Sequence, residues 1–143
     1  MALGVAMLTL AVAAAGGGPR PALMPWPASI ELVAGELEVG PDFRVTVSGE
    51  GGALVERAAG RFVARLARQT GLALPSPLAP ADEATLEIRC ESPGKPLPHL
   101  GMDESYSLKV TPAGATLQAP ELWGVMRGSC RPARPRPSGP RPW

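Results

Sequence analysis

The chain has 143 residues, which is room for one domain of ordinary size and not for two. Apolar residues make up 45% of it and aromatic residues 4%, so it can form a core, although Gly and Pro together account for 17 + 18 = 35 residues. The net charge of +1 hides an acidic body between residues 31 and 127, with 9 − 13 = −4, flanked by arginines, which argues against a nucleic-acid-binding domain.

The N-terminus carries an apolar run from Leu3 to Ala15 that ends on small residues of the kind signal peptidase accepts. Its 13 residues are too few to span a bilayer, which takes about 20. No Lys or Arg precedes the run, so a leader without a targeting role is the alternative. We expect a signal-peptide-like leader at residues 1–15, a Gly/Pro-rich linker at 16–27, and an exported protein (secreted, periplasmic or lysosomal) with no stable membrane span.

Alternation of apolar and polar residues predicts the first strands. They are Ser29–Val33, Glu36–Val39 and Phe43–Ser48. A helix is then predicted from Ala53 to Thr70, with Gly71 as its left-handed cap. Its apolar residues fall on one stripe at helical spacing: Val55, Ala59, Phe62, Val63 and Leu66.

Past a Pro-rich loop at 74–84, the chain alternates again in the predicted strand Thr85–Cys90. A loop follows at 91–102. Tyr106–Val110 and Ala115–Ala119 then form a predicted hairpin, in whose turn Gly114 is expected to be left-handed. Glu121–Arg127 has the composition of the first two turns of another helix.

Regular patterning stops after Gly128, because residues 129–143 contain five prolines and four arginines with no period. We predict an unstructured tail there, arising from a frame shift, alternative splice or gene-model error. A proline-rich ligand centred on Pro135 and Pro137 is the other reading. Residues 28–128 are predicted to form an α+β domain, a small mostly antiparallel sheet with helices packed on one face.

Four segments in order resemble family 20 glycoside hydrolases, the β-N-acetylhexosaminidases. Leu23-Met24-Pro25-Trp26-Pro27 with Ile30-Glu31-Leu32 resembles the family's opening, and Glu56-Arg57-Ala58 through Arg61-Phe62 to Gln69-Thr70-Gly71 its first helix. Asp103 to Leu108 is similar to the start of its hairpin, and Ala119 to Gly128 to the segment leading into its next helix. The resemblance covers residues 23–128.

The resemblance implies a non-catalytic N-terminal domain that supports a TIM-barrel catalytic domain. It also implies a family activity, release of terminal N-acetylhexosamine from glycoconjugates or chitin oligomers by substrate-assisted hydrolysis, in which an adjacent Asp-Glu pair of the barrel takes part. The barrel is the expected partner, and this chain alone is predicted to be inactive. The alternative is a free-standing glycan- or protein-binding module without enzymatic activity.

Adjacent acids occur at Asp82-Glu83 and Asp103-Glu104, but both precede the point where the family's barrel would begin. We therefore predict no catalytic residue, no cofactor-binding residue and no metal ligand. His99 is the only histidine and lacks the partners of a metal site or a catalytic dyad. Cys90 lies in a predicted strand and is expected to be a small buried hydrophobe, while Cys130 lies in the predicted tail.

Arginines line the polar side of the first helix: Arg57, Arg61, Arg65 and Arg68. This stripe could be a nucleic-acid footprint, but the acidic body and the scarcity of aromatic residues favour a solvated helix face. Trp26 and Trp123 are expected to pack between this domain and its partner, rather than to form a sugar-stacking surface, and Trp143 belongs to the tail.

Overall fold

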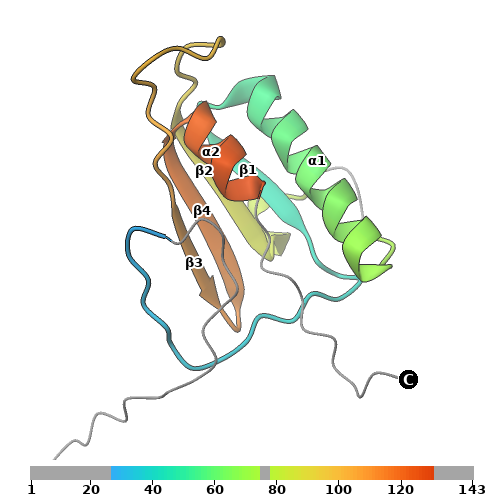
Figure 1. The fold of residues 1–143 in the computed structure, drawn as a ribbon. Coiled ribbons are helices and arrows are strands. Elements are labelled where there is room, and N and C mark those ends of the chain that lie inside the picture. The colour runs from blue at the N-terminus through green and yellow to red at the C-terminus, as the bar shows by residue number, and fades with distance from the viewer. Residues whose placement is uncertain (1–26, 75–77, 131–143) are drawn as a thin grey trace, which may run out of the picture.

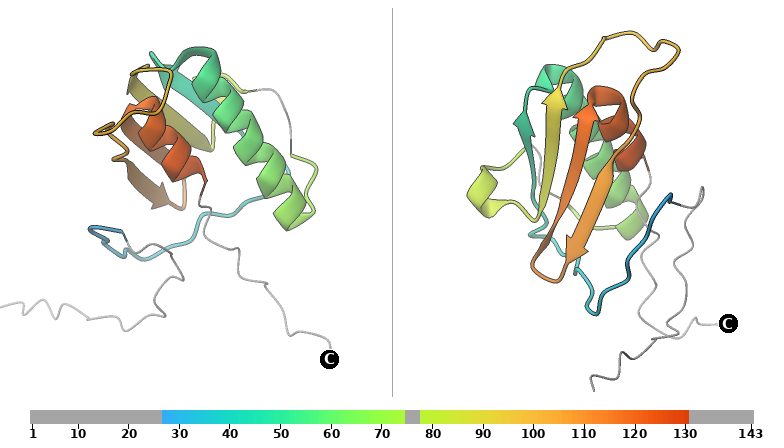
Figure 2. Two further views of the ribbon diagram at one scale, coloured as in Figure 1. Left: turned by 45° about the horizontal axis from the view of Figure 1, so that its top comes forward. Right: turned by 90° about the vertical axis from the view of Figure 1, so that its left-hand side faces the viewer.

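The computed structural model describes residues 27–74 and 78–130. Its elements in chain order are β1 (Val45–Gly49), α1 (Gly52–Thr70), the short 3-10 turn η1 (Ala81–Glu83), β2 (Leu86–Ser92), β3 (Ser107–Thr111), β4 (Gly114–Glu121) and α2 (Leu122–Ser129). The strands form one sheet, and both helices lie against the same side of it (Figures 1 and 2). We call the side that carries the helices the helix side and the opposite side the outer face. The predicted α+β class with helices on one face is confirmed.

The sheet is mixed, which corrects the expectation of a mostly antiparallel one. Its strand order is β1-β2-β4-β3, with β1 parallel to β2, β2 parallel to β4, and only β3 antiparallel to β4. The reason lies in the connection: α1 crosses from the end of β1 back to the start of β2, and such a crossover joins parallel strands. Only the short hairpin between β3 and β4 reverses direction.

Helix α1 matches the prediction closely. It begins at Gly52, one residue before the expected start, and ends at Thr70. Gly71 has φ +74° and donates its N–H to the Ala67 carbonyl at 2.8 Å, which is the predicted left-handed cap. The predicted stripe faces the sheet, with Phe62 only half-buried at its margin, and the buried residues of the helix are Val55, Ala58, Ala59, Val63 and Leu66.

Two of the predicted strands are wrong. Residues 29–33 and 36–39 belong to no strand of the described structure, and Leu37 and Val39 only pack against the core from outside. Alternation gives a chain two faces, but a strand also needs a neighbour to accept its backbone hydrogen bonds. The third predicted strand is confirmed with shifted bounds, because β1 starts at Val45 and the buried Phe43 precedes it.

The hairpin is confirmed, but its turn differs from the prediction. Pro112 and Ala113 alone form the turn, and Gly114 pairs with Thr111 as the first residue of β4. Gly114 does not have a positive φ, so it is not left-handed. A lack of space, rather than a left-handed backbone, accounts for a glycine at this position, because a Cβ on Gly114 would lie 2.9 Å from the Thr85 carbonyl oxygen.

The helix predicted at Glu121–Arg127 is confirmed as α2, which starts one residue later and extends to Ser129. Ser129, predicted to open the tail, is therefore helical and buried. The leader, most of the linker and the tail from Arg131 lie outside the described residues. No helix among the residues that the structure describes is long and apolar enough to cross a membrane.

One core lies between the sheet and the two helices. Its central side chains are fully enclosed, with Val55, Ile88 and Val125 at 0% exposure. The buried members of the core are Phe43, Val45, Val55, Ala59, Val63, Leu66, Leu86, Ile88, Cys90, Leu117, Ala119, Leu122 and Val125.

Candidate functional site

The adjacent acids of the sequence do not converge on a common cleft. Asp82 and Glu83 lie exposed on η1, between α1 and β2, whereas Asp103 and Glu104 lie on the loop between β2 and β3. Hydrogen bonds from Ser105 lower the pKa of Asp103. The bond from the Ser105 side chain has the larger effect, and the Ser105 backbone N–H adds a second bond to Asp103 Oδ1 at 2.8 Å. Each acid of this second pair thus has a structural role, because Glu104 forms an ion pair with Arg127 of α2.

His99 and the two cysteines form no reactive centre in the described part of the chain. His99 lies half-buried in the loop between β2 and β3, and its Nδ1 has no hydrogen-bond partner there. Cys90 is 1% exposed in β2 and donates its thiol to the Ser92 carbonyl at 3.1 Å. Burial raises the pKa of the Cys90 thiol, which disfavours the nucleophilic thiolate. Among residues 27–74 and 78–130, no three His, Cys, Asp or Glu side chains gather in a metal-binding arrangement.

The four arginines along α1 have different roles. Arg57, Arg61 and Arg68 are exposed. Arg65 is partly buried and donates from Nη1 to the Cys130 carbonyl at 2.7 Å, at the C-terminal end of α2. A cation at this end of a helix stabilises the carbonyls that have no partner within the helix. Arg65 therefore joins the two helices, so the four arginines do not form a surface of four equivalent phosphate ligands.

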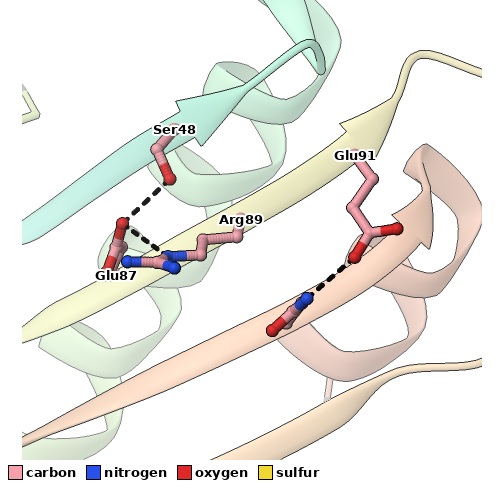
Figure 3. Close-up of polar contacts among 5 residues, drawn as sticks. Ser48, Glu87, Arg89 and Glu91 are labelled. Carbon is pink, nitrogen blue, oxygen red and sulfur yellow. Dashed lines mark hydrogen bonds and ion pairs between the residues drawn. The ribbon is translucent and has the colours of Figure 1, made fainter.

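The outer face of the sheet carries a ladder of polar side chains (Figure 3). Glu87 accepts hydrogen bonds from the Ser48 hydroxyl at 2.9 Å and from Arg89 Nε at 2.8 Å. The Arg89 hydrogen bond is the main cause of a lowered pKa for Glu87, against an opposing effect of burial. One step along, Gln118 Nε2 donates to Glu91 Oε1 at 2.7 Å. These groups largely satisfy one another, which leaves a polar surface with few unmet hydrogen bonds.

A shallow, open hollow lies beside this ladder. The residues that line it come from η1, β2 and the hairpin, and they are Ala81, Ala84, Thr85, Glu87, Lys109, Thr111, Ala113, Gly114, Ala115 and Thr116. Binding pockets for small molecules are typically enclosed and lined by apolar and aromatic side chains. This hollow has no aromatic residue among its described lining, so it offers a sugar ring nothing to stack on.

The most specific contacts of the domain surround α2. Trp123 Nε1 donates to the Lys95 carbonyl at 3.1 Å, and Arg127 pairs with Glu104, so two side chains of α2 hold the loop between β2 and β3. A Cβ on Gly124 would lie 2.1 Å from the Ser105 carbonyl oxygen. A Cβ on Gly128 would lie 2.5 Å from Leu117 Cδ1. The end of the loop between β2 and β3 and the start of the hairpin can therefore pack this closely against α2 only because α2 has glycines at positions 124 and 128.

Sequence reasoning missed this packing surface. Gly124 and Gly128 are four residues apart, a spacing that puts two small residues on one face of a helix and permits close approach. That signal was available once α2 had been predicted. Trp123 is half-buried and contacts the domain's own loop, and its expected packing between this domain and its partner stays a prediction. Trp26 and Trp143 lie outside the described residues.

The sequence and the fold both resemble those of known proteins. Residues 20–129 match the family described as glycosyl hydrolase family 20, domain 2. The fold is similar to that of the solved chitobiase of Flavobacterium johnsoniae, with a TM-score of 0.70 and 31% identity, over 76% of this chain and 17% of that one. The chain thus spans only a small part of that relative's length. A search of curated proteins gave no match. The chain belongs to glycosyl hydrolase family 20, in which it corresponds to the non-catalytic domain 2.

Proposed function

We propose that this domain supports the catalytic barrel of a β-N-acetylhexosaminidase, an enzyme that releases terminal N-acetylhexosamine from glycoconjugates or chitin oligomers, and that it performs no chemistry itself. The observation that carries this proposal is the match to domain 2 of family 20 over residues 20–129. The likeness to a chitobiase supports the substrate class. The separation of the acid pairs on two different loops supports the absence of a catalytic role for this domain.

We expect the barrel to contact the helix side rather than the outer face. The outer face carries Glu87, Arg89 and Glu91, whose charged groups already have partners within the sheet, so its burial would cost desolvation for little new bonding. On the helix side, Arg57, Arg61 and Arg68 form no ion pair with any described residue. Acidic or carbonyl groups of a partner would find donors there.

An activity assay tests the first part of this proposal. The purified chain, incubated with a chromogenic N-acetylglucosaminide, is expected to release no chromophore above a matched blank. Turnover that survives purification and scales with protein concentration would show that the domain is catalytic.

A chimera tests the supporting role. Residues 27–130 of this chain would be fused ahead of the Flavobacterium johnsoniae chitobiase from which its own matching region has been removed. We expect the fusion to lose activity on heating at a temperature several degrees above that of the truncated chitobiase. An unrelated soluble domain of the same size, fused in the same place, serves as the control, and equal protection by both would contradict a specific role.

We also propose that the chain is exported, on the strength of the apolar run Leu3–Ala15. N-terminal sequencing of protein secreted by an export-competent host should begin close after Ala15, and an intact Met1 on exported protein would contradict cleavage. We propose further that the change in composition after Gly128 reflects a frame shift, an alternative splice or a gene-model error. The nucleotide sequence downstream of that codon, translated in all frames, should then encode the barrel.

A further inference from the structure

The helix side of β3 lacks a cover among the described residues. Helix α1 packs against β1, and α2 packs against β4 and β2, so neither helix makes an extended contact with β3. Figures 1 and 2 show the hairpin end of β3 beyond the end of α2. Leu108 and Leu117 lie directly opposite each other in the hairpin and therefore share a face of the sheet. Leu117, which α2 covers, is 3% exposed, whereas Leu108 is 51% exposed.

Leu108 belongs to a strip of three exposed apolar side chains. Tyr106, immediately before β3, and Val110 are each two residues away from it, and alternate residues of an extended chain lie on the same face. Tyr106 is 37% exposed and Val110 is 45% exposed. We call Tyr106, Leu108 and Val110 the β3 strip. Contiguous apolar side chains on a surface mark contact sites, whereas single ones are ordinary. The β3 strip therefore has the character of a surface that a partner covers.

The β3 strip lies beside the last turn of α2. A Cβ on Gly128 would lie 3.0 Å from Tyr106 Cδ2, so α2 ends next to the strip. The family match ends at residue 129, and the matched region makes up 17% of the solved chitobiase. The resemblance to family 20 implies that the catalytic barrel follows this domain. In the full-length enzyme, the chain after α2 would therefore start next to Tyr106.

The small size of the β3 strip indicates which partner covers it. A specific interface between separate proteins buries about 800 Å² on each partner. Three side chains that are 37–51% exposed offer far less, so a second copy or a separate protein would gain too little from the strip alone. A partner joined to the domain at α2 needs less contact area, because the link gives it a high effective concentration. We infer that the β3 strip is a docking surface for the catalytic barrel of the full-length enzyme, an inference that rests on the proposed supporting role.

Hydroxyl-radical footprinting tests the contact directly. It compares the full chain with the chitobiase chimera described above. Tyr106 and Leu108 should be modified at least about threefold more slowly in the chimera, because burial in an interface excludes solvent from them. Leu97 and Leu100, which are 75% and 103% exposed in the loop between β2 and β3, serve as controls and should react equally in both proteins. Equal rates for Tyr106 and Leu108, or protection of the two loop leucines in their place, would overturn the inference.

A charged substitution tests whether the contact matters. Lysine is common on solvated edge strands, so the full chain with Leu108→Lys should keep its unfolding temperature. In the chimera, Leu108→Lys should lower the temperature at which activity is lost by several degrees, because docking would bury an unpaired charge. Leu100→Lys, the same change on the loop, is the matched control and should have no effect in either protein.

The outcomes separate this inference from the proposed function. A chimera whose heat resistance is unchanged by Leu108→Lys overturns the docking surface alone. An unsubstituted chimera that is no more heat-resistant than the truncated chitobiase overturns the supporting role and the docking surface together. Sedimentation of the full chain gives the last outcome, because a dimer that Leu108→Lys dissociates would make a second copy the partner of the β3 strip and overturn the inference.

Discussion

The two sides of the sheet use alternate residues of the same strands for different purposes. Along β2, Leu86, Ile88 and Cys90 face the helices with 6%, 0% and 1% exposure, while Glu87, Arg89 and Glu91 occupy the outer face. The helix side removes apolar surface from water, at about 25 cal/mol per Å². The outer face exchanges hydrogen bonds to water for hydrogen bonds between side chains, which gains little. The domain's stability therefore comes mainly from the helix side, while the outer face presents polar side chains to water.

The largest effect should come from truncating the centre of the helix side. Ile88→Ala removes a side chain with no exposure and leaves a cavity that a sheet held by two helices cannot readily close. We expect a loss of about 2–5 kcal/mol in the free energy of unfolding, measured by urea denaturation of the full chain. Arg89→Ala, one residue away on the outer face, is the control and should have a much smaller effect. Equal losses for the two variants would remove the distinction between the sides.

Glycines have different roles in α2 and in α1. A Cβ on Gly124 would meet the Ser105 carbonyl oxygen at 2.1 Å and Ala119 Cβ at 2.8 Å, neither of which can rotate away. Gly124→Ala should therefore cost about 1–3 kcal/mol through overpacking. Gly60, in the middle of α1, has nothing within 4 Å of a built Cβ, and Gly60→Ala should stabilise the domain by roughly 0.5–1 kcal/mol. Thermal unfolding of the two variants should shift in opposite directions, and a stable Gly124→Ala variant would refute the close packing of α2.

The same contrast explains what the sequence could predict. Helix α1 carries its signal locally, since the apolar stripe and Gly71 define its face and its end. The confirmed hairpin likewise needs only neighbouring residues. The parallel pairing of β1 with β2 joins residues about forty positions apart, and no local pattern specifies it. The segment at 29–33 shows the converse, because its alternation predicts a strand while the structure gives it no ladder.

The candidate site follows the same rule. Membership of family 20 could be predicted from short motifs such as Asp103 to Leu108 and Ala119 to Gly128. The same resemblance led to the prediction that this domain holds no catalytic residue. The contacts that position α2 could not be predicted in this way, because their partners are distant in sequence. Arg65 binds Cys130, and Trp123 binds Lys95. Side chains with no distinctive pattern of their own acquire these roles only when the chain folds.

Trp123 should have an intermediate effect. Its indole N–H donates to the Lys95 carbonyl at 3.1 Å, and Trp123→Phe removes this donor while keeping most of the apolar body. We expect a loss of about 0.5–1.5 kcal/mol. The change should be concentrated in the loop between β2 and β3, where hydrogen exchange of residues 93–102 should accelerate while that of α1 stays unchanged. Faster exchange spread evenly over α1 and the loop would mean that Trp123 supports the whole core instead.

The smallest effect should come from the outer face, through Glu87 and pH. Hydrogen bonds from Arg89 and Ser48 lower the pKa of Glu87 in the folded state, so the folded carboxylate holds its proton less tightly than the unfolded one. This contribution is complete well above the unfolded pKa of about 4.3 and is lost as the pH falls through the folded pKa. Because the pair is largely exposed, it should amount to less than about 1 kcal/mol and shrink further in 0.5 M salt. Glu87→Gln should therefore lower stability slightly at pH 6 and by less at pH 3, as measured by urea denaturation at both pH values. A loss at pH 6 as large as that of Ile88→Ala would mean that the outer face contributes to stability on the same scale as the core, and the assignment of stability to one side of the sheet would be wrong.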